Sequence, residues 1–301
     1  MAFARPVTHR GLLVLLILTW AISWPVIKVG VASVPPLWYA VFRYAIAAAS
    51  LFAAAAVRGE IAWPPRQDWV LIAVSGTLQM AAYSALTGTA LTVLPPGRAS
   101  ILAFSTPIWV APLAAWWAHE FLSRAALAGI GLGLLGVLAI AAPSFAHGGG
   151  GHAGAYLMLI AAAASWAVSI VFVRVHSFAA SPLALAPWQM ALAAALLVPI
   201  AIGLEGAPRA PDLTGTLSLG FVGPVATAFA YWAVVEAGRS QRASTMAVAL
   251  LATPVLGLLI SAATLGEKID APLLLGAAFI GVGIRLCTTS RCAPERSRPG
   301  R

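Results

Sequence analysis

The chain has 301 residues, of which 61% are hydrophobic and 9% charged, with a net charge of +9 and a mean hydropathy of +0.92. A soluble domain is about 45–50% apolar and about 25% charged, so this composition excludes an ordinary soluble protein. The basic residues are scattered singly between apolar runs, which argues against a nucleic-acid partner. A multi-span membrane protein is the class that remains.

In chain order, apolar runs long enough to cross a bilayer alternate with breaks rich in Pro, Gly and charge. The runs lack the strict alternation of membrane-barrel strands, so we expect an all-α integral membrane protein. The first run follows two arginines, as a secretory signal does, but its two tryptophans, Pro25 and Lys28 favour a retained span. The ten predicted transmembrane helices cover residues 11–29, 36–57, 69–92, 98–118, 125–142, 154–174, 183–203, 214–236, 243–264 and 271–288.

Lysines and arginines are shared unevenly between the two sets of predicted loops. The side opposite the N-terminus carries four of them, namely Lys28, Arg98, Arg209 and Lys268. The N-terminal side carries twelve, namely Arg5, Arg10, Arg58, Arg66, Arg124, Arg174, Arg239, Arg242, Arg291, Arg296, Arg298 and Arg301. Because short cytoplasmic loops carry the excess of positive charge, we expect an inner-membrane protein with both termini, including a basic tail over 289–301, in the cytoplasm.

The two halves of the chain resemble each other. Residues 20–23 (Trp-Ala-Ile-Ser) match residues 166–169 (Trp-Ala-Val-Ser) at a shift of 146, and Thr106-Pro107 matches Thr253-Pro254 at a shift of 147. The pattern predicts one five-helix repeat over 1–146, a Gly-rich linker over 147–152 and a second repeat over 153–288. Because each repeat has an odd number of spans, the second must be inverted, with a pseudo-twofold axis in the membrane plane.

These landmarks also resemble a known family, the drug/metabolite transporter superfamily of the EamA type. Gly266-Glu267 fits the Gly-Glu pattern that ends a helix in this family, whereas His119-Glu120 departs from it in the first repeat. The other marks are the Gly-rich fifth span and the residues Trp20, Lys28, Arg43, Pro107 and Pro254. The resemblance implies ten helices in two repeats, outward transport and, from the tryptophan-rich interior, similarity to an exporter of aromatic amino acids.

The sequence contains no hydrolytic, redox or nucleotide-binding motif, so we expect no enzyme and no cofactor or metal. The acidic residues all fall in loops or at the ends of spans, whereas proton-coupled carriers keep a carboxylate or histidine chain inside the bilayer. This distribution favours facilitative transport by alternating access. The expected partners are a small-molecule substrate and the lipid bilayer, and the oligomeric state stays open, a monomer included.

Polar and aromatic side chains within the spans identify candidate substrate-binding residues. Gln79, Tyr83 and Thr87 follow each other at intervals of four on one face of the third span, which lipid would not favour. Aromatic faces with a few hydroxyl and amide groups suit an amphipathic solute. The candidates are Trp20, Ser23, Trp24, Gln79, Tyr83, Trp166, Ser169 and Tyr231.

Arg43, Pro107 and Pro254 are candidate gating or structural residues. Arg43 lies about seven residues inside the second span, where it either ties helices together or contacts substrate; Gln189 stands at the matching position. The prolines kink their helices, beside the central path or as hinges. We therefore expect an exporter of hydrophobic or aromatic amino acids and related metabolites. The alternative is a multidrug or other small-metabolite exporter of the same superfamily, with proton coupling as an option.

Overall fold

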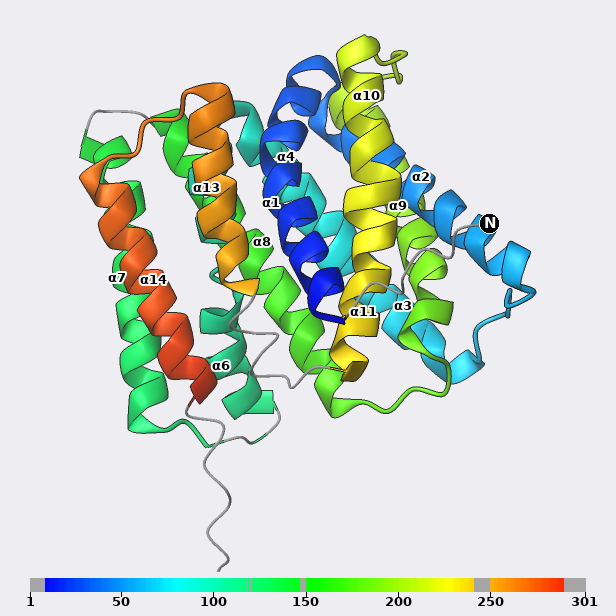
Figure 1. Cartoon of the computed structure of the whole chain (residues 1–301), viewed down its shortest axis with the longest axis horizontal. Helices are drawn as coiled ribbons and strands as arrows, with labels where there is room; N and C mark the ends of the chain where they lie inside the picture. The colour runs from blue at the N-terminus through cyan, green and yellow to red at the C-terminus, as the bar shows by residue number, and fades with distance from the viewer. Residues whose placement is uncertain (1–8, 118, 120, 147–149, 241–249, 290–301) are drawn as a thin grey trace, which may run out of the picture.

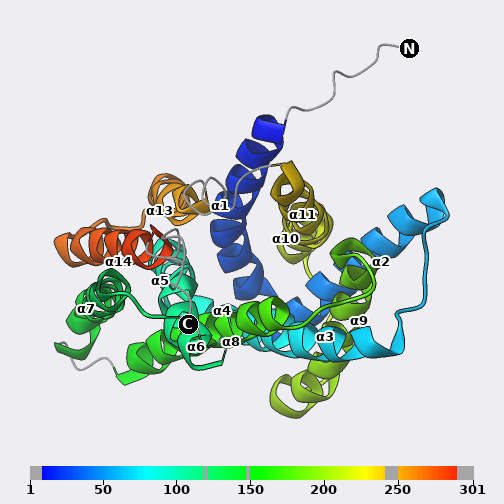
Figure 2. The same cartoon turned by 90° about the horizontal axis from the view of Figure 1, so that it is seen from below.

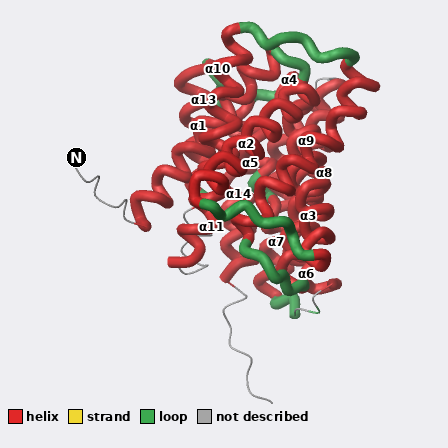
Figure 3. The backbone as a smooth tube through the Cα atoms, turned by 90° about the vertical axis from the view of Figure 1, so that its right-hand side faces the viewer, coloured by secondary structure: helices red, strands yellow, loops and turns green. Residues whose placement is uncertain are grey.

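The computed structural model describes residues 9–117, 119, 121–146, 150–240 and 250–289, and these residues are helical apart from short connections. Figure 3 shows the helices running side by side, with loops gathered at two ends. In the first half, the elements are α1 (His9–Ser33), α2 (Pro36–Arg58), η1 (Arg66–Asp68), α3 (Trp69–Val74), η2 (Ser75–Ala82), α4 (Tyr83–Val93), α5 (Pro96–Ala103), α6 (Thr106–Trp117) and α7 (Arg124–Ala146). In the second half, they are α8 (Gly150–Val175), α9 (Pro182–Glu205), α10 (Leu213–Phe221), η3 (Val222–Phe229), α11 (Ala230–Ser240), α13 (Ala252–Leu265) and α14 (Ala271–Thr289).

The predicted ten-span, all-helical fold is confirmed. Within the described residues, nine helical stretches are long and apolar enough to cross a membrane, and the shorter apolar helix α13 lies in the ninth predicted span, at 243–264. Several predictions fall outside these residues: the first part of the span at 243–264, the tail beyond residue 289, Glu120 and the linker residues 147–149. The rest of the predicted linker is helical, because α8 begins at Gly150. The long apolar helix that follows outweighs the cost of about 1 kcal/mol for each glycine in its first turn.

The packing of the helices obeys a pseudo-twofold exchange between the halves. Figure 2 shows α7 beside α14 at one end of the cross-section and α2 beside α9 at the other. Between them, α1 packs against α10, α11 and α13, while α8 makes the equivalent contacts with α4, α5 and α6. The two halves are thus inverted repeats. Both α1 and α14 have an end on the same side, which carries the connections at 59–65 and 176–181 and which we call the terminal face (Figure 1). The other side is the opposite face.

Glycines make the α7–α14 contact close enough for backbone to meet backbone. A Cβ added to Gly136 would lie 2.6 Å from the carbonyl oxygen of Gly276, and one added to Gly129 would lie 2.7 Å from that of Gly283. Gly129 and Gly276 occupy matching positions in the repeats, as do Gly136 and Gly283. The crossing is therefore symmetric within one chain, and only glycine fits at its four contact points.

The repeats contain π-helical segments that were not predicted, and a break in the fourth span where Pro107 predicted a kink. The third and eighth spans each contain a π-helical segment, η2 and η3, and the two segments begin and end 147 residues apart. The fourth span, predicted as one helix over 98–118, is broken between Ala103 and Thr106. The break occurs just before Pro107, which cannot donate a backbone hydrogen bond to the preceding turn and restricts the residue before it.

Glycine and histidine occupy equivalent positions where two spans end. Gly266 follows α13 with φ of 67°, and His119, 147 residues earlier, has φ of 52°. Left-handed backbone is free of steric cost for glycine but not for histidine. This geometry explains the glycine of the Gly-Glu pattern and shows that the first repeat departs from it at a backbone cost.

Candidate functional site

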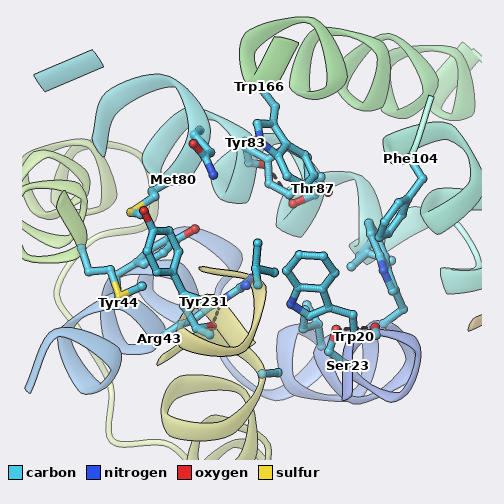
Figure 4. A pocket seen from close by; sticks show the side chains of 18 residues that line it. Trp20, Ser23, Arg43, Tyr44, Met80, Tyr83, Thr87, Phe104, Trp166 and Tyr231 are labelled. Carbon is cyan, nitrogen blue, oxygen red and sulfur yellow. Dashed lines mark hydrogen bonds between the residues drawn. The ribbon is translucent and has the colours of Figure 1, made fainter. Parts of the chain in front are cut away.

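A central cavity lies between the two halves of the bundle. It has a volume of about 170 Å³, room for roughly six waters at about 30 Å³ each or for a solute of comparable size. Its lining comes from both repeats, and Figure 4 shows the side chains reaching one space from several helices. The lining consists of Trp20, Ser23, Trp24, Ile27, Arg43, Tyr44, Gln79, Met80, Tyr83, Thr87, Leu91, Phe104, Trp166, Met190, Ala226, Thr227, Tyr231 and Val234.

One wall of the cavity is an aromatic cluster on α1 and at the break before α6. The rings of Trp20 and Trp24 each lie 6.4 Å from the ring of Phe104, centroid to centroid. Phe104 stands in the non-helical turn between α5 and α6, so the break in the fourth span delivers this ring to the cavity. The hydroxyl of Ser23 donates to the carbonyl oxygen of Trp20 at 2.7 Å, so its hydrogen atom is already bonded within α1. This wall offers a flat apolar solute large contact areas.

A second aromatic pair comes from the two repeats together. The rings of Tyr83 on α4 and Trp166 on α8 meet edge to face with centroids 5.0 Å apart (Figure 4). Tyr231 on α11 donates a long hydrogen bond of 3.5 Å to Oε1 of Gln189 on α9. Because this wall is built across the halves, any relative movement of the halves would change its shape.

The π-helical segments place polar groups at the cavity. A π-helix accommodates an extra residue per turn and is frequent at functional sites. The widened backbone is stabilised by side chains, because Thr227 donates to the carbonyl of Val222 at 2.7 Å and Ser165 donates to that of Leu78 at 2.8 Å. Gln79 and Met80 on η2 and Ala226 and Thr227 on η3 line the cavity. The sequence gives no periodic signal for such segments, so this geometry could not be predicted.

Arg43 reaches the cavity from α2 and contacts the second repeat. Its Nε donates to Oγ1 of Thr227 at 2.8 Å, and its guanidinium carbon lies 5.4 Å from the centroid of the Tyr44 ring. The hydroxyl of Tyr44 is hydrogen-bonded to Ser84 at 2.7 Å. The guanidinium is therefore held between a hydroxyl and an aromatic face, and both of these partners are neutral.

A second hollow continues from the central cavity towards the terminal face. It has a volume of about 400 Å³ and shares three lining residues with the first, namely Gln79, Trp166 and Tyr231. The remaining lining extends to Phe178, Ala180 and Pro182, at the connection before α9. The three shared side chains thus form a partition between the cavity and the terminal face.

On the opposite face, polar contacts hold the helix ends together. The carboxylate of Glu267 accepts hydrogen bonds from the backbone N–H groups of Gly97 at 2.7 Å and Arg98 at 3.0 Å, at the start of α5. Arg98 also pairs with Asp270. Partial burial raises the pKa of Asp270, but the hydrogen bonds and charge that Arg98 supplies, with the N–H of Leu273, leave the pKa below its usual value. We call this set the α5–α13 latch.

A lysine adds to the closure of this face. Nζ of Lys28 on α1 donates to the carbonyl oxygens of Leu91 at 2.6 Å and Thr92 at 3.3 Å, at the end of α4. Leu91 also lines the cavity and is 1% exposed. The described helix ends thus close over the cavity on the opposite face, whereas a hollow extends from it on the terminal face.

The structure brings seven of the eight predicted substrate-binding residues to one cavity. Ser169 is the exception: it is fully buried behind the lining, 3.2 Å from the hydroxyl of Ser75, and donates to Oε1 of Gln79 at 3.3 Å. Arg43 lines the cavity, while Pro107, beside the break in the fourth span, and Pro254, in the first turn of α13, lie outside the lining. The binding and gating roles of all these residues stay predictions.

Sequence reasoning missed part of the lining. The cavity is also lined by Phe104, Tyr44, Met80 and Met190, which are residue types common in any apolar core. Tyr44 follows the predicted residue Arg43 in the sequence, and Met80 follows Gln79. Their position depends on the helix break and the π-helical turns. Among the described residues, no group of three His, Cys, Asp or Glu side chains is placed to hold a metal ion.

Inverted helical repeats around a solute-sized cavity define a small-molecule membrane transporter. The sequence profile of the EamA-like transporter family matches residues 10–142 and again residues 153–289. The chain belongs to this family.

Several curated relatives match over nearly their whole length. A Salmonella typhimurium protein named "Probable amino-acid metabolite efflux pump" is 29% identical over 91% of this chain and 92% of its own. A Streptantibioticus cattleyicolor protein named "Probable terminal-alkyne amino-acid exporter" is 29% identical over 96% of this chain and 97% of its own. A solved crystal structure of a protein 25% identical in sequence covers 93% of this chain and 96% of its own, with a TM-score of 0.62.

Proposed function

We propose that this protein exports hydrophobic or aromatic amino acids and related metabolites by facilitative alternating access. The observation that carries the proposal is the aromatic cavity between inverted repeats, closed towards one face by the α5–α13 latch and continued by a hollow towards the other. Pseudo-symmetric halves can exchange two such shapes at similar free energy. The names of the relatives, one an amino-acid metabolite efflux pump and one an amino-acid exporter, agree with this substrate class.

The proposal includes an orientation and a division into halves. The terminal face lies in the cytoplasm of a cell with the protein in its inner membrane, because the excess of Lys and Arg falls there. One half comprises residues 1–146 and the other 153–288, joined by the short Gly-rich segment. The structure in this orientation offers its cavity to cytoplasmic solutes, as an exporter requires before loading.

The test is uptake of radiolabelled aromatic amino acids into proteoliposomes, with and without an imposed pH gradient. We expect saturable uptake that the pH gradient leaves unchanged. Trp166→Ala, which removes part of the cavity wall, should lower uptake at least fivefold. Trp116→Ala is the matched control, because Trp116 is 77% exposed on the outside of the bundle. Uptake of cationic dyes but of no amino acid would support the multidrug alternative, and uptake driven by the pH gradient would refute facilitative transport.

A further inference from the structure

The electrostatic character of the cavity depends on one side chain. Arg43 is the charged residue among the 18 described residues of the lining, and the rest are aromatic, aliphatic, hydroxyl or amide side chains. The position that matches Arg43 in the second repeat is Gln189, so one half brings a positive charge to the central region and the other a neutral amide.

Two terminal nitrogens of Arg43 have no hydrogen bond to the part of the chain that the structure describes. The hydrogen bond of Arg43 to Thr227 uses Nε, and neither Nη1 nor Nη2 hydrogen-bonds to a described residue. The oxygen that accepts this bond is itself fixed, because the Thr227 hydroxyl donates to the carbonyl of Val222. Thr227 therefore holds the guanidinium in place, and the fork formed by its two Nη atoms makes no hydrogen bond to a described residue. A carboxylate fits that fork with two parallel charge-assisted hydrogen bonds, which gain strength away from bulk water.

An ammonium group finds no equivalent partner among the described residues that line the cavity. The oxygen atoms near the cavity are neutral: the amide oxygen of Gln79 accepts from Ser169, and the hydroxyls of Ser23 and Thr87 donate to carbonyls of their own helices. An ammonium in the same cavity is also repelled by the guanidinium of Arg43, and this repulsion is stronger in an apolar site than in water. The lining thus favours one negative charge and opposes a positive one.

The remaining walls recognise the apolar end of the solute. The rings of Trp20, Trp24 and Phe104 form one wall, and those of Tyr83 and Trp166 form another. We infer that Arg43 anchors the carboxylate of the cargo, and that the preferred cargo is an aromatic or large aliphatic carboxylate whose amino group is absent or acylated. This inference rests on the proposed function and narrows its substrate class: monoanions are carried better than zwitterions, and zwitterions better than cations.

A monoanionic cargo also supplies a driving force for export without a proton. A membrane potential of about 100 mV, negative inside, holds a monoanion at a roughly fortyfold higher concentration outside at equilibrium. A zwitterion gains nothing from the potential. The charge of Arg43 would thus decide both which solutes bind and how a facilitative carrier becomes an exporter.

The experiment compares four solutes that share a benzyl group and differ in their charged end. They are 3-phenyllactate, N-acetylphenylalanine, phenylalanine and 2-phenylethylamine. Net uptake is measured in proteoliposomes whose potential is held at zero by valinomycin and equal potassium, and then at a fixed potassium gradient. For wild type, we expect KM for the two monoanions to be at least tenfold lower than for phenylalanine, no carrier-dependent uptake of the amine, and an effect of potential on the monoanions alone.

Two variants separate charge from packing. Arg43→Gln, which copies Gln189 of the other repeat, should raise KM for the monoanions at least tenfold and bring it level with that for phenylalanine. Arg43→Lys keeps the charge but not the fork, so it should retain the order of the solutes with a KM several-fold higher. Quenching of tryptophan fluorescence by each solute gives an independent measure of binding, since three tryptophans line the cavity. A thermal unfolding curve for each variant confirms that it is folded.

The outcomes separate the two proposals. Equal or better transport of phenylalanine or of the amine by wild type would overturn the inference and leave the exporter proposal standing. An unchanged order of solutes in a folded Arg43→Gln protein would also overturn it, and the Arg43→Lys result decides the matter if the glutamine variant fails to fold. Carriage of none of the four solutes would refute the proposed function, and the inference with it.

Discussion

Replacing Glu267 should open the protein on its opposite face. The carboxylate accepts two backbone hydrogen bonds at the start of α5, at 2.7 and 3.0 Å, and lies where the helix dipole favours negative charge. Hydrogen bonds to a charged group contribute about 1.5–3 kcal/mol, and because Glu267 is half-buried we take the lower part of that range, about 1.5–2 kcal/mol. If the latch forms in this conformation alone, Glu267→Ala shifts the conformational equilibrium roughly 10- to 30-fold towards opening.

A single cysteine at position 91 reports that opening. Leu91 lines the cavity and is 1% exposed under the α4 end that Lys28 contacts. In a background without the two native cysteines, Leu91→Cys is treated in intact cells with a membrane-impermeant thiol reagent, which reaches the extracytoplasmic face. We expect Glu267→Ala to raise the rate of modification at least tenfold, and Glu267→Gln, which keeps one acceptor oxygen, to raise it less.

Glu205→Ala is the matched control for this reasoning. Its carboxylate accepts from the backbone N–H groups of Leu37 at 2.9 Å and Trp38 at 3.0 Å, on the same face and also between the halves. However, it joins α9 to α2, which pack along their length at the end of the bundle. Its removal should lower thermal stability and change the rate at position 91 less than twofold. An equal effect of the two variants, or no effect of Glu267→Ala, would refute the assignment of the latch.

Three further predictions concern stability. Gly136→Leu should destabilise the protein by about 1–3 kcal/mol, because a Cβ there would lie 2.6 Å from a carbonyl oxygen of α14. Gly131→Leu is the control and should not destabilise it, because a Cβ at Gly131 would meet nothing within 4 Å. Thermal unfolding in detergent compares the two variants. His119→Gly should raise stability by about 0.5–1 kcal/mol in the same assay by relieving left-handed backbone, and a lower melting temperature would contradict this. Asp270→Asn should lower the melting temperature at pH 5–7, but not below pH 3. The pKa of Asp270 is depressed by Arg98, so its contribution is present above the unfolded pKa of about 4 and lost as pH falls through the folded one; a constant difference across pH would contradict the pairing.

The fold followed from the sequence where its cause is local. Apolar length located the spans, and the odd number of spans between matching landmarks such as Trp20 and Trp166 implied inverted halves. The π-helical segments were not predictable, because they depend on packing between the halves, whereas Pro107 predicted a kink in the fourth span but not a full break in the helix. Gly76 on η2 packs against the backbone of Gln189 on α9, and Gly223 on η3 packs against the backbone of Arg43 on α2. These contacts form only when α2 and α9 are in place.

The candidate site was predictable in outline, because local helical spacing shows which face of a span is polar. Polar side chains at helical spacing identified the inward face of the third span, and Gln79, Tyr83 and Thr87 do line the cavity. The orientation of Ser169 could not be deduced, since its helix contacts η2, whose widened turn brings Gln79 and Ser75 within reach of its hydroxyl. Phe104 could not be found either, because a break in a helix decided which way its ring points.

The mismatch between Arg43 and Gln189 bears on why two such halves are joined in one polypeptide. Tyr231, whose ring lines the cavity, contacts Gln189, so both mismatched positions lie next to the central cavity. Two identical five-helix chains assembled as an antiparallel homodimer would have to place the same residue at both positions. With arginine they would crowd two like charges into an apolar space, and with glutamine they would have none. Gene fusion after duplication removes that constraint and lets the copies diverge separately.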